Sequence, residues 1–133
     1  MTFRQFLQTH NVYLDGGMGT LLQARGLGAG EQPERWNITH ADEVIAVHKA
    51  YFAAGSNVVC ANTFGANALH FDEDELELII QAAMQNAKAA KASSISTHEK
   101  FIAMDIGPLG KLLSPYGDLA FEDAVTLFKK SIT

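Results

Sequence analysis

The sequence predicts an α/β fold in which parallel strands alternate with helices, amounting to about three βα units. Short apolar or β-branched runs end in polar residues and glycine at three places, Val12–Leu14, Val58–Ala61 and Phe101–Gly110. After each run, apolar residues recur at the spacing of three and four positions that is typical of a helix. Strands separated by helices pair in parallel, because each return to the sheet requires a crossover connection.

Length and composition exclude several classes of protein. A chain of 133 residues with 47% hydrophobic residues is long enough for one core and too short for two domains. The net charge is −5 and no run of Lys or Arg occurs, which argues against a nucleic-acid-binding protein. No apolar run approaches the roughly 20 residues of a membrane span, and the first ten residues lack the apolar core of a signal peptide. We therefore expect no membrane association and a cytoplasmic location.

The first third of the chain alternates between short elements and a long loop. Phe3, Phe6 and Leu7 lie at helical spacing and predict a short helix ahead of the first strand, Val12–Leu14. Met18–Ala24 predicts one or two helical turns. Several glycines and a proline then indicate a long loop, and Trp36 follows in it, either covering the core or forming a pocket wall.

The remainder of the chain has three predicted helices. Val44, Val47, His48 and Tyr51 form one face of a helix that ends at Gly55. After the second strand, acidic residues at 72–77 begin an Ala-rich helix with Lys88 and Lys91 near its end, an arrangement that suits the helix dipole. A last amphipathic helix begins at Phe121 and is expected to run to Thr133, with no glycine or proline to stop it.

The loop after the first strand, with the sequence DGGMGT, is the first candidate site. Its glycines match neither a Walker loop nor a dinucleotide-binding fingerprint, so phosphate binding is disfavoured. Adjacent glycines expose backbone N–H groups, and the start of a helix adds a positive dipole end. Asp15 could then bind an ammonium group while the amides of Gly16, Gly17 and Met18 bind a carboxylate, which makes an amino-acid site. The alternative is that Asp15 caps the following turn and the glycines only bend the chain.

Polar residues also follow the other two strands. Because the loops after parallel strands emerge at one edge of the sheet, Asp15, Asn62, Thr63 and Asp105 are expected to meet at one rim. Cys60, the only cysteine, lies within the second strand and is interpreted as a small buried apolar residue rather than a nucleophile. A single cysteine also excludes an intrachain disulfide, and a zinc site built from cysteines cannot be completed by this chain alone.

Three segments together carry a resemblance to a known family. The stretches LDGGMGTLLQARGL, PERWNITHADEVIAVHKAYFAAGSNVVCANTFGAN and DIGPLGKLLSPYGDLAFEDA resemble the homocysteine S-methyltransferase family. Within it they are most similar to the homocysteine-binding domain that opens cobalamin-dependent methionine synthase. The resemblance runs from about Val12 to the last residue, and three motifs in order make it specific.

This resemblance implies a fold, a reaction and a set of site residues. The fold would be the N-terminal part of a (β/α)₈ TIM barrel, with residues 1–133 forming a homocysteine-binding domain cut short at its C-terminal end. In the family, zinc held by three cysteine thiolates binds the homocysteine sulfur, which then attacks a methyl group and gives methionine. Asp15 matches the aspartate that binds the substrate ammonium, and the amides near Gly16, Gly17 and Met18 fit its carboxylate. Asn62 and Thr63 would line the pocket, with the loop Gly107–Gly110 as a further wall.

The departures from the family pattern concern the metal. The zinc cysteines of the family fall on segments that this sequence does not contain, Cys60 matches none of them, and the acidic partner expected near a fourth strand is also absent. The resemblance therefore implies no metal ligand and no catalytic residue in this chain. Cobalamin, or another methyl donor such as betaine or a methylsulfonium, would be bound by other domains or partners.

Three hypotheses follow. The first is the N-terminal portion of a zinc-dependent homocysteine S-methyltransferase, inactive alone, whose partners are homocysteine and the remainder of the barrel. The second is a non-catalytic assembly module that pairs with another copy through its open sheet edges and covers exposed apolar surface in this way. The third is an α/β ligand-binding protein unrelated to methyl transfer, which only the glycines at the strand ends support.

Overall fold

The structure is a computed structural model that describes residues 1–132. Its elements, in chain order, are α1 (Phe3–Thr9), α2 (Gly19–Ala24), the 3₁₀ helix η1 (Pro33–Arg35), α3 (Trp36–Thr39), α4 (Ala41–Ala53), β1 (Val58–Cys60), α5 (Glu73–Ser93), β2 (Phe101–Ala103) and α6 (Phe121–Ile132). The order alternates strands with helices, as predicted. The last helix begins at Phe121 as expected, and its expected final residue, Thr133, lies outside the described residues.

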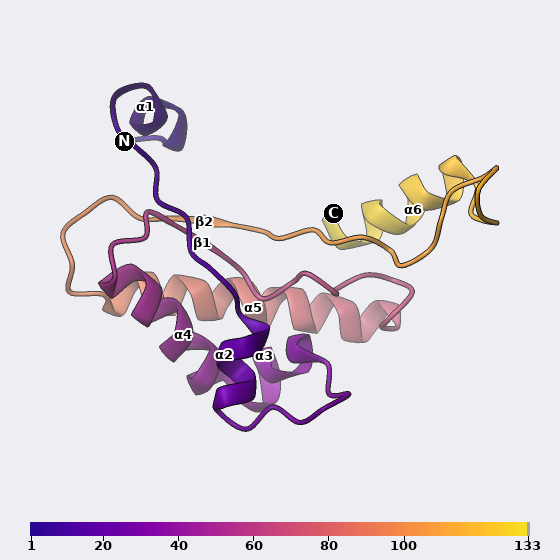
Figure 1. Ribbon diagram of the computed structural model, residues 1–133, viewed down its shortest axis with the longest axis horizontal. Helices are drawn as coiled ribbons and strands as arrows, with labels where there is room; N and C mark the ends of the chain where they lie inside the picture. Colours follow the sequence, from indigo (N-terminus) through magenta and orange to yellow (C-terminus); the bar gives the residue numbers. More distant parts are fainter. Residues whose placement is uncertain (133) are drawn as a thin grey trace.

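A parallel pair of strands forms the centre of the fold. β1 pairs with β2 in a register that places Val58 opposite Phe101 and Cys60 opposite Ala103. Helices α4 and α5 lie on one side of the strands and α1 lies on the other, while the chain after β2 runs to the far end of the molecule and α6 leads back from there (Figure 1). Parallel pairing brings the loops that follow the strands to the same edge.

The predicted first strand, Val12–Leu14, is reduced to a single bridge, so this prediction was wrong in extent. Leu14 bridges Val58 in parallel, and the backbone N–H of Asp15 donates to the Val58 carbonyl at 3.0 Å. Tyr13 and Leu14 remain 63% and 64% exposed. The segment is nevertheless held to β1, because the N–H groups of Asn57 and Val58 both donate to the Tyr13 carbonyl, at 2.7 and 3.2 Å.

Helix α4 packs largely as its periodicity predicts. Val44, Val47, His48 and Phe52 are buried on one face. The helix ends in a Schellman motif at Gly55, which has φ +106°; its N–H donates to the Phe52 carbonyl at 3.1 Å, and the next N–H donates to the Tyr51 carbonyl. The glycine is required here because an L side chain rarely adopts a positive φ.

The core forms where α4, α5 and the strands meet. One cluster joins Phe52 of α4, Val59 of β1 and two alanines of α5, Ala87 and Ala90, all of them fully buried. The small alanine side chains let α5 approach the strands closely, which explains the Ala-rich stretch in the sequence. No helix within residues 1–132 combines the length and the apolar character that a membrane span requires.

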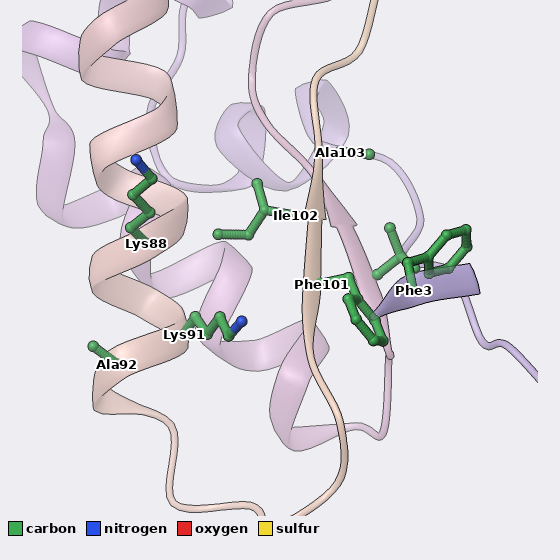
Figure 2. A pocket seen from close by; sticks show the side chains of 8 residues that line it. Phe3, Lys88, Lys91, Ala92, Phe101, Ile102 and Ala103 are labelled. Carbon is green, nitrogen blue, oxygen red and sulfur yellow. The ribbon is translucent and has the colours of Figure 1, made fainter. Parts of the chain in front are cut away.

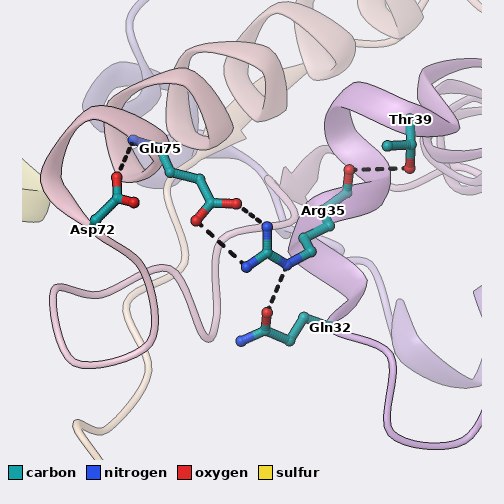
Figure 3. Close-up of polar contacts among 5 residues, drawn as sticks. All are labelled: Gln32, Arg35, Thr39, Asp72 and Glu75. Atoms are coloured by element: carbon teal, nitrogen blue, oxygen red, sulfur yellow. Dashed lines mark hydrogen bonds and ion pairs between the residues drawn. The ribbon is translucent and has the colours of Figure 1, made fainter.

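The segment expected to be a long loop around Trp36 is instead helical. Trp36 opens α3 and is 5% exposed in a core cluster, so it covers the core, and it also lines a hollow beside α3. Arg35, just before it, pairs with Glu75 in the first turn of α5 and also bonds the Gln32 side chain at 2.8 Å (Figure 3). Asp72 caps α5 by accepting the Glu75 N–H at 2.9 Å. These contacts tie the η1 and α3 segment to the start of α5.

Candidate functional site

A pocket of about 290 Å³ lies at the ends of the strands, a volume near the lower end of small-molecule sites. It is lined by residues from all three strand-end segments and from η1: Asp15, Gly16, Gly17, Met18, Gly19, Pro33, Glu34, Cys60, Ala61, Asn62, Thr63, Phe64 and Asp105. The six residues that the sequence singled out as a candidate binding site therefore lie around one cavity, and Asp105 joins them as expected for a shared rim.

Asp15 is anchored to β1 rather than to the helix that follows it. Its Oδ2 atom accepts the backbone N–H of Cys60 at 2.8 Å. The N-cap position of α2 is Met18 and has no side-chain cap hydrogen bond, so the interpretation of Asp15 as a cap of that helix is wrong. Burial raises the pKa of the Asp15 carboxyl, hydrogen bonds from Cys60 oppose this, and the nearby charge of Asp105 adds to the increase. A carboxylate has about four acceptor positions, so Asp15 retains capacity for a ligand.

The glycine loop presents free donors beside this carboxylate. Within residues 1–132, the backbone N–H groups of Gly17 and Met18 donate no hydrogen bond. The Tyr51 hydroxyl donates to the Gly17 carbonyl at 2.6 Å and holds the loop from the α4 side. A Cβ at Gly16 would lie 2.9 Å from the same hydroxyl, so the absence of a side chain permits this contact. An acidic group and free amides therefore lie side by side.

Asn62 lines the pocket, but its side chain serves the surrounding structure. Its Nδ2 donates to the Pro33 carbonyl at 2.8 Å and to Asn37 Oδ1 at 3.0 Å. Asn37 donates back to the Asn62 carbonyl at 2.8 Å and accepts at its own carbonyl from Asn86 of α5. This buried amide network fixes the end of β1 against η1 and α5, and it thereby holds the pocket wall in place.

The hydrogen bonds of the Thr63 hydroxyl likewise go to the surrounding structure. It is 1% exposed, and its hydroxyl donates to the Asp105 carbonyl at 2.6 Å and accepts the Asp105 N–H at 3.1 Å. The loop Gly107–Gly110, expected as a further wall, is not part of the lining. Instead Gly107 supports Phe64, whose carbonyl accepts its N–H at 3.1 Å.

Glu34 was not identified from the sequence. It lies in η1, is 7% exposed and lines the pocket, and its Oε1 accepts the Gly65 N–H at 2.7 Å. A Cβ at Gly65 would lie only 2.7 Å from that oxygen, so glycine is needed for the contact. Its neighbour Pro33 at the start of η1 marks a helix start in the sequence, but nothing in the sequence indicates that the carboxylate turns inward.

Cys60 is half-buried on the pocket wall. Burial raises the pKa of its thiol to about 11, and the charge and hydrogen bonding of Asp15 add to the increase. The thiol therefore stays protonated near neutral pH. Because only the deprotonated thiolate is nucleophilic or binds zinc, Cys60 is suited to neither role. Across residues 1–132, no group of three or more His, Cys, Asp or Glu side chains is arranged to hold a metal ion.

The fold matches part of known structures. The metallated form of the homocysteine methyltransferase MmuM from Escherichia coli matches 97% of this chain with a TM-score of 0.82 and 20% identity. Its oxidized form matches 80% of the chain with a TM-score of 0.70 and 23% identity. At these identities the likeness shows a shared fold. The chain spans 51% and 41% of the length of these two structures.

Sequence comparison gives the family. The family model of the homocysteine S-methyltransferases matches residues 12–133, so this chain belongs to the homocysteine S-methyltransferase family. A methionine synthase from Mycobacterium leprae (strain TN) is 32% identical over 109 residues, which cover 74% of this chain and 9% of that protein. The family assignment from the three sequence motifs is thereby confirmed.

Proposed function

We propose that this chain forms the amino-acid-binding half of a homocysteine S-methyltransferase site. The observation that carries the proposal is the pocket at the strand ends, where the Asp15 carboxylate lies beside the free N–H groups of Gly17 and Met18. These groups suit the two charged ends of an amino acid. The family membership supports homocysteine as that amino acid.

The chemistry of this half-site is recognition. The substrate ammonium would approach the Asp15 carboxyl. Burial raises the pKa of this carboxyl, and the positive charge of the ammonium would oppose that increase by favouring the ionised form. The substrate carboxylate would accept hydrogen bonds from the glycine loop. A bound amino acid would direct its side chain away from these two anchors. Orientation of this kind contributes to catalysis by fixing the reacting atom before the reaction begins.

The residues of this chain do not fit the zinc that the family resemblance implies. Zinc sites of that type need several thiolates, and the chain offers one thiol with a pKa of about 11. We therefore propose that activation of the homocysteine thiol depends on groups beyond these residues, and that the chain alone does not transfer methyl groups. We further propose that its strands belong to a (β/α)₈ barrel, which the likeness to MmuM supports. The methyl donor would be bound elsewhere.

A titration followed by nuclear magnetic resonance tests the proposal. L-homocysteine, kept reduced, is added to ¹⁵N-labelled chain while backbone amide signals are recorded. We expect saturable shifts at Cys60, whose N–H reports on Asp15, and at Gly17 and Met18. In Asp15→Asn, which keeps the size of the side chain, the affinity falls because the ammonium loses its charged partner. The absence of saturable shifts in the wild-type chain would contradict the proposal.

Self-association is a second candidate, favoured by exposed apolar surface along the strands. A hollow of about 550 Å³ lies between α1, β2 and α5. Figure 2 shows Phe3 beside Phe101 on one side of β2, with Lys88 and Lys91 extending from α5 on the other. We expect a second copy to pair along β2 in this case. Light scattering that gives a monomer mass at all concentrations would exclude this candidate.

A further inference from the structure

Asp105 is the second carboxylate at the strand ends. It follows β2 by two residues, is half-buried and lines the same pocket as Asp15. The parallel register continues past the strands, because the N–H of Ala61 donates to the Ala103 carbonyl at 2.8 Å. The two carboxylates therefore follow the two segments that flank β1, and both line one cavity.

The position of Asp105 is fixed by a buried side chain. The Thr63 hydroxyl bonds both the N–H and the carbonyl of Asp105, at 3.1 and 2.6 Å. Thr63 itself is 1% exposed, so its hydroxyl is not available to a ligand. Its function in the pocket is then to hold the Asp105 backbone, and through it the direction from which the carboxylate faces the cavity.

The charges around the pocket favour a cation between these two residues. Asp15, Glu34 and Asp105 are its ionisable carboxyl groups, and no Lys or Arg is among its described lining residues. Glu34 already accepts the Gly65 N–H. The charge of Asp105 raises the pKa of Asp15, which indicates repulsion between the two carboxylates. An ammonium group bound between them would relieve that repulsion.

We propose that Asp105 binds the substrate ammonium together with Asp15, and that Thr63 is the positioning residue that sets Asp105 for this contact. The inference rests on the proposed function and deepens it, because it makes the pocket selective for the amino group. A ligand with the same thiol and carboxylate but without the ammonium would meet two unpaired carboxylates. Such a ligand would bind weakly and would gain nothing from Asp105.

The test compares two ligands across matched variants, using the same amide signals. L-homocysteine carries the ammonium, and 4-mercaptobutanoate is its analogue without it. We expect Asp105→Asn to weaken homocysteine binding about fivefold or more, the effect of losing one charge-assisted contact in a half-buried site, and to leave the analogue unchanged or bound more tightly. Thr63→Val should weaken homocysteine binding in the same sense, and Thr63→Ser, which keeps the hydroxyl, should restore it. Asp118→Asn removes an exposed charge that does not line the pocket and should have no effect.

The outcomes separate this inference from the proposed function. If Asp105→Asn binds homocysteine as tightly as the wild type does, while Asp15→Asn binds it more weakly, the role of Asp105 is overturned. The proposed function is not contradicted by that result. An equal loss for both ligands in Asp105→Asn would make Asp105 a structural residue and also overturn the inference. If the wild-type chain does not bind homocysteine, the proposed function and this inference fail together. Dispersed amide spectra of each variant confirm that it is folded.

Discussion

His48 gives the chain a stability that depends on pH. It is fully buried in α4, and both ring nitrogens lack a hydrogen-bond partner within the described residues. Burial lowers its pKa from 6.5 to about 4, because the charged imidazolium has no compensating contact. The folded protein therefore holds this histidine in its neutral form at all pH values above about 4.

The sign of the effect follows from proton binding. Between pH 6.5 and pH 4 the unfolded chain binds a proton at His48 and the folded chain does not. Stability is therefore complete above about pH 6.5 and falls as the pH falls toward 4. One pKa unit corresponds to about 1.4 kcal/mol, so the whole effect is about 3 kcal/mol and the part between pH 7 and pH 5 is about 2 kcal/mol.

Urea unfolding of the wild type and of His48→Leu at pH 7 and pH 5 measures this effect. Trp36 is the only tryptophan and is 5% exposed, so its fluorescence reports on the core, with circular dichroism as a second probe. We expect the free energy of unfolding to fall by about 2 kcal/mol more in the wild type than in the variant. Asp15, whose pKa is raised, acts in the opposite sense in both proteins and cancels in the comparison. Equal pH dependence in the two proteins would show that burial of His48 does not make stability depend on pH.

Three further predictions concern the site and its supports. Asp15→Asn should lower the pKa of the Cys60 thiol from about 11 and speed its alkylation by iodoacetamide at pH 8. The effect is partial, because burial is the larger cause of the raised pKa and remains in the variant. An unchanged alkylation rate would contradict the interaction between Asp15 and the thiol. Gly107→Ala should destabilise the chain by roughly 1–3 kcal/mol, since its Cβ would lie 2.3 Å from a backbone carbonyl oxygen, whereas Gly19→Ala, with open space around it, should not destabilise it. Asn37→Ala should cost about 2–4 kcal/mol in urea unfolding, because it leaves buried amide groups at the end of β1 without partners; a loss below about 1 kcal/mol would show that the network is not needed.

Local signals in the sequence predicted much of the fold. The acidic start and Ala-rich face of α5, the glycine that ends α4 and the apolar run of β1 are all decided by neighbouring residues, and each element is found where it was expected. The grouping of Asp15 with Asp105 was predictable for a different reason. Parallel strands send the loops that follow them to one edge, whatever those loops contain.

Features that depend on distant contacts could not be predicted. The first strand is limited to the Leu14 bridge, and its extent depends on how it pairs with β1, which the local sequence does not describe. Glu34 reaches the pocket only because Gly65, far along the chain, lets it approach. For Asn62 and Thr63 the location was predictable but the direction of their hydrogen bonds was not, and those bonds make both residues supports of the site.

Calorimetric titration of L-homocysteine into the wild-type chain and into Asp15→Ala, each with and without zinc, measures whether this pocket binds the amino acid through Asp15. The proposed half-site predicts weak binding to the wild type that does not depend on zinc and is lost in Asp15→Ala. Binding that requires zinc, or that survives the loss of the Asp15 carboxylate, would contradict the claim that this pocket recognises the amino acid.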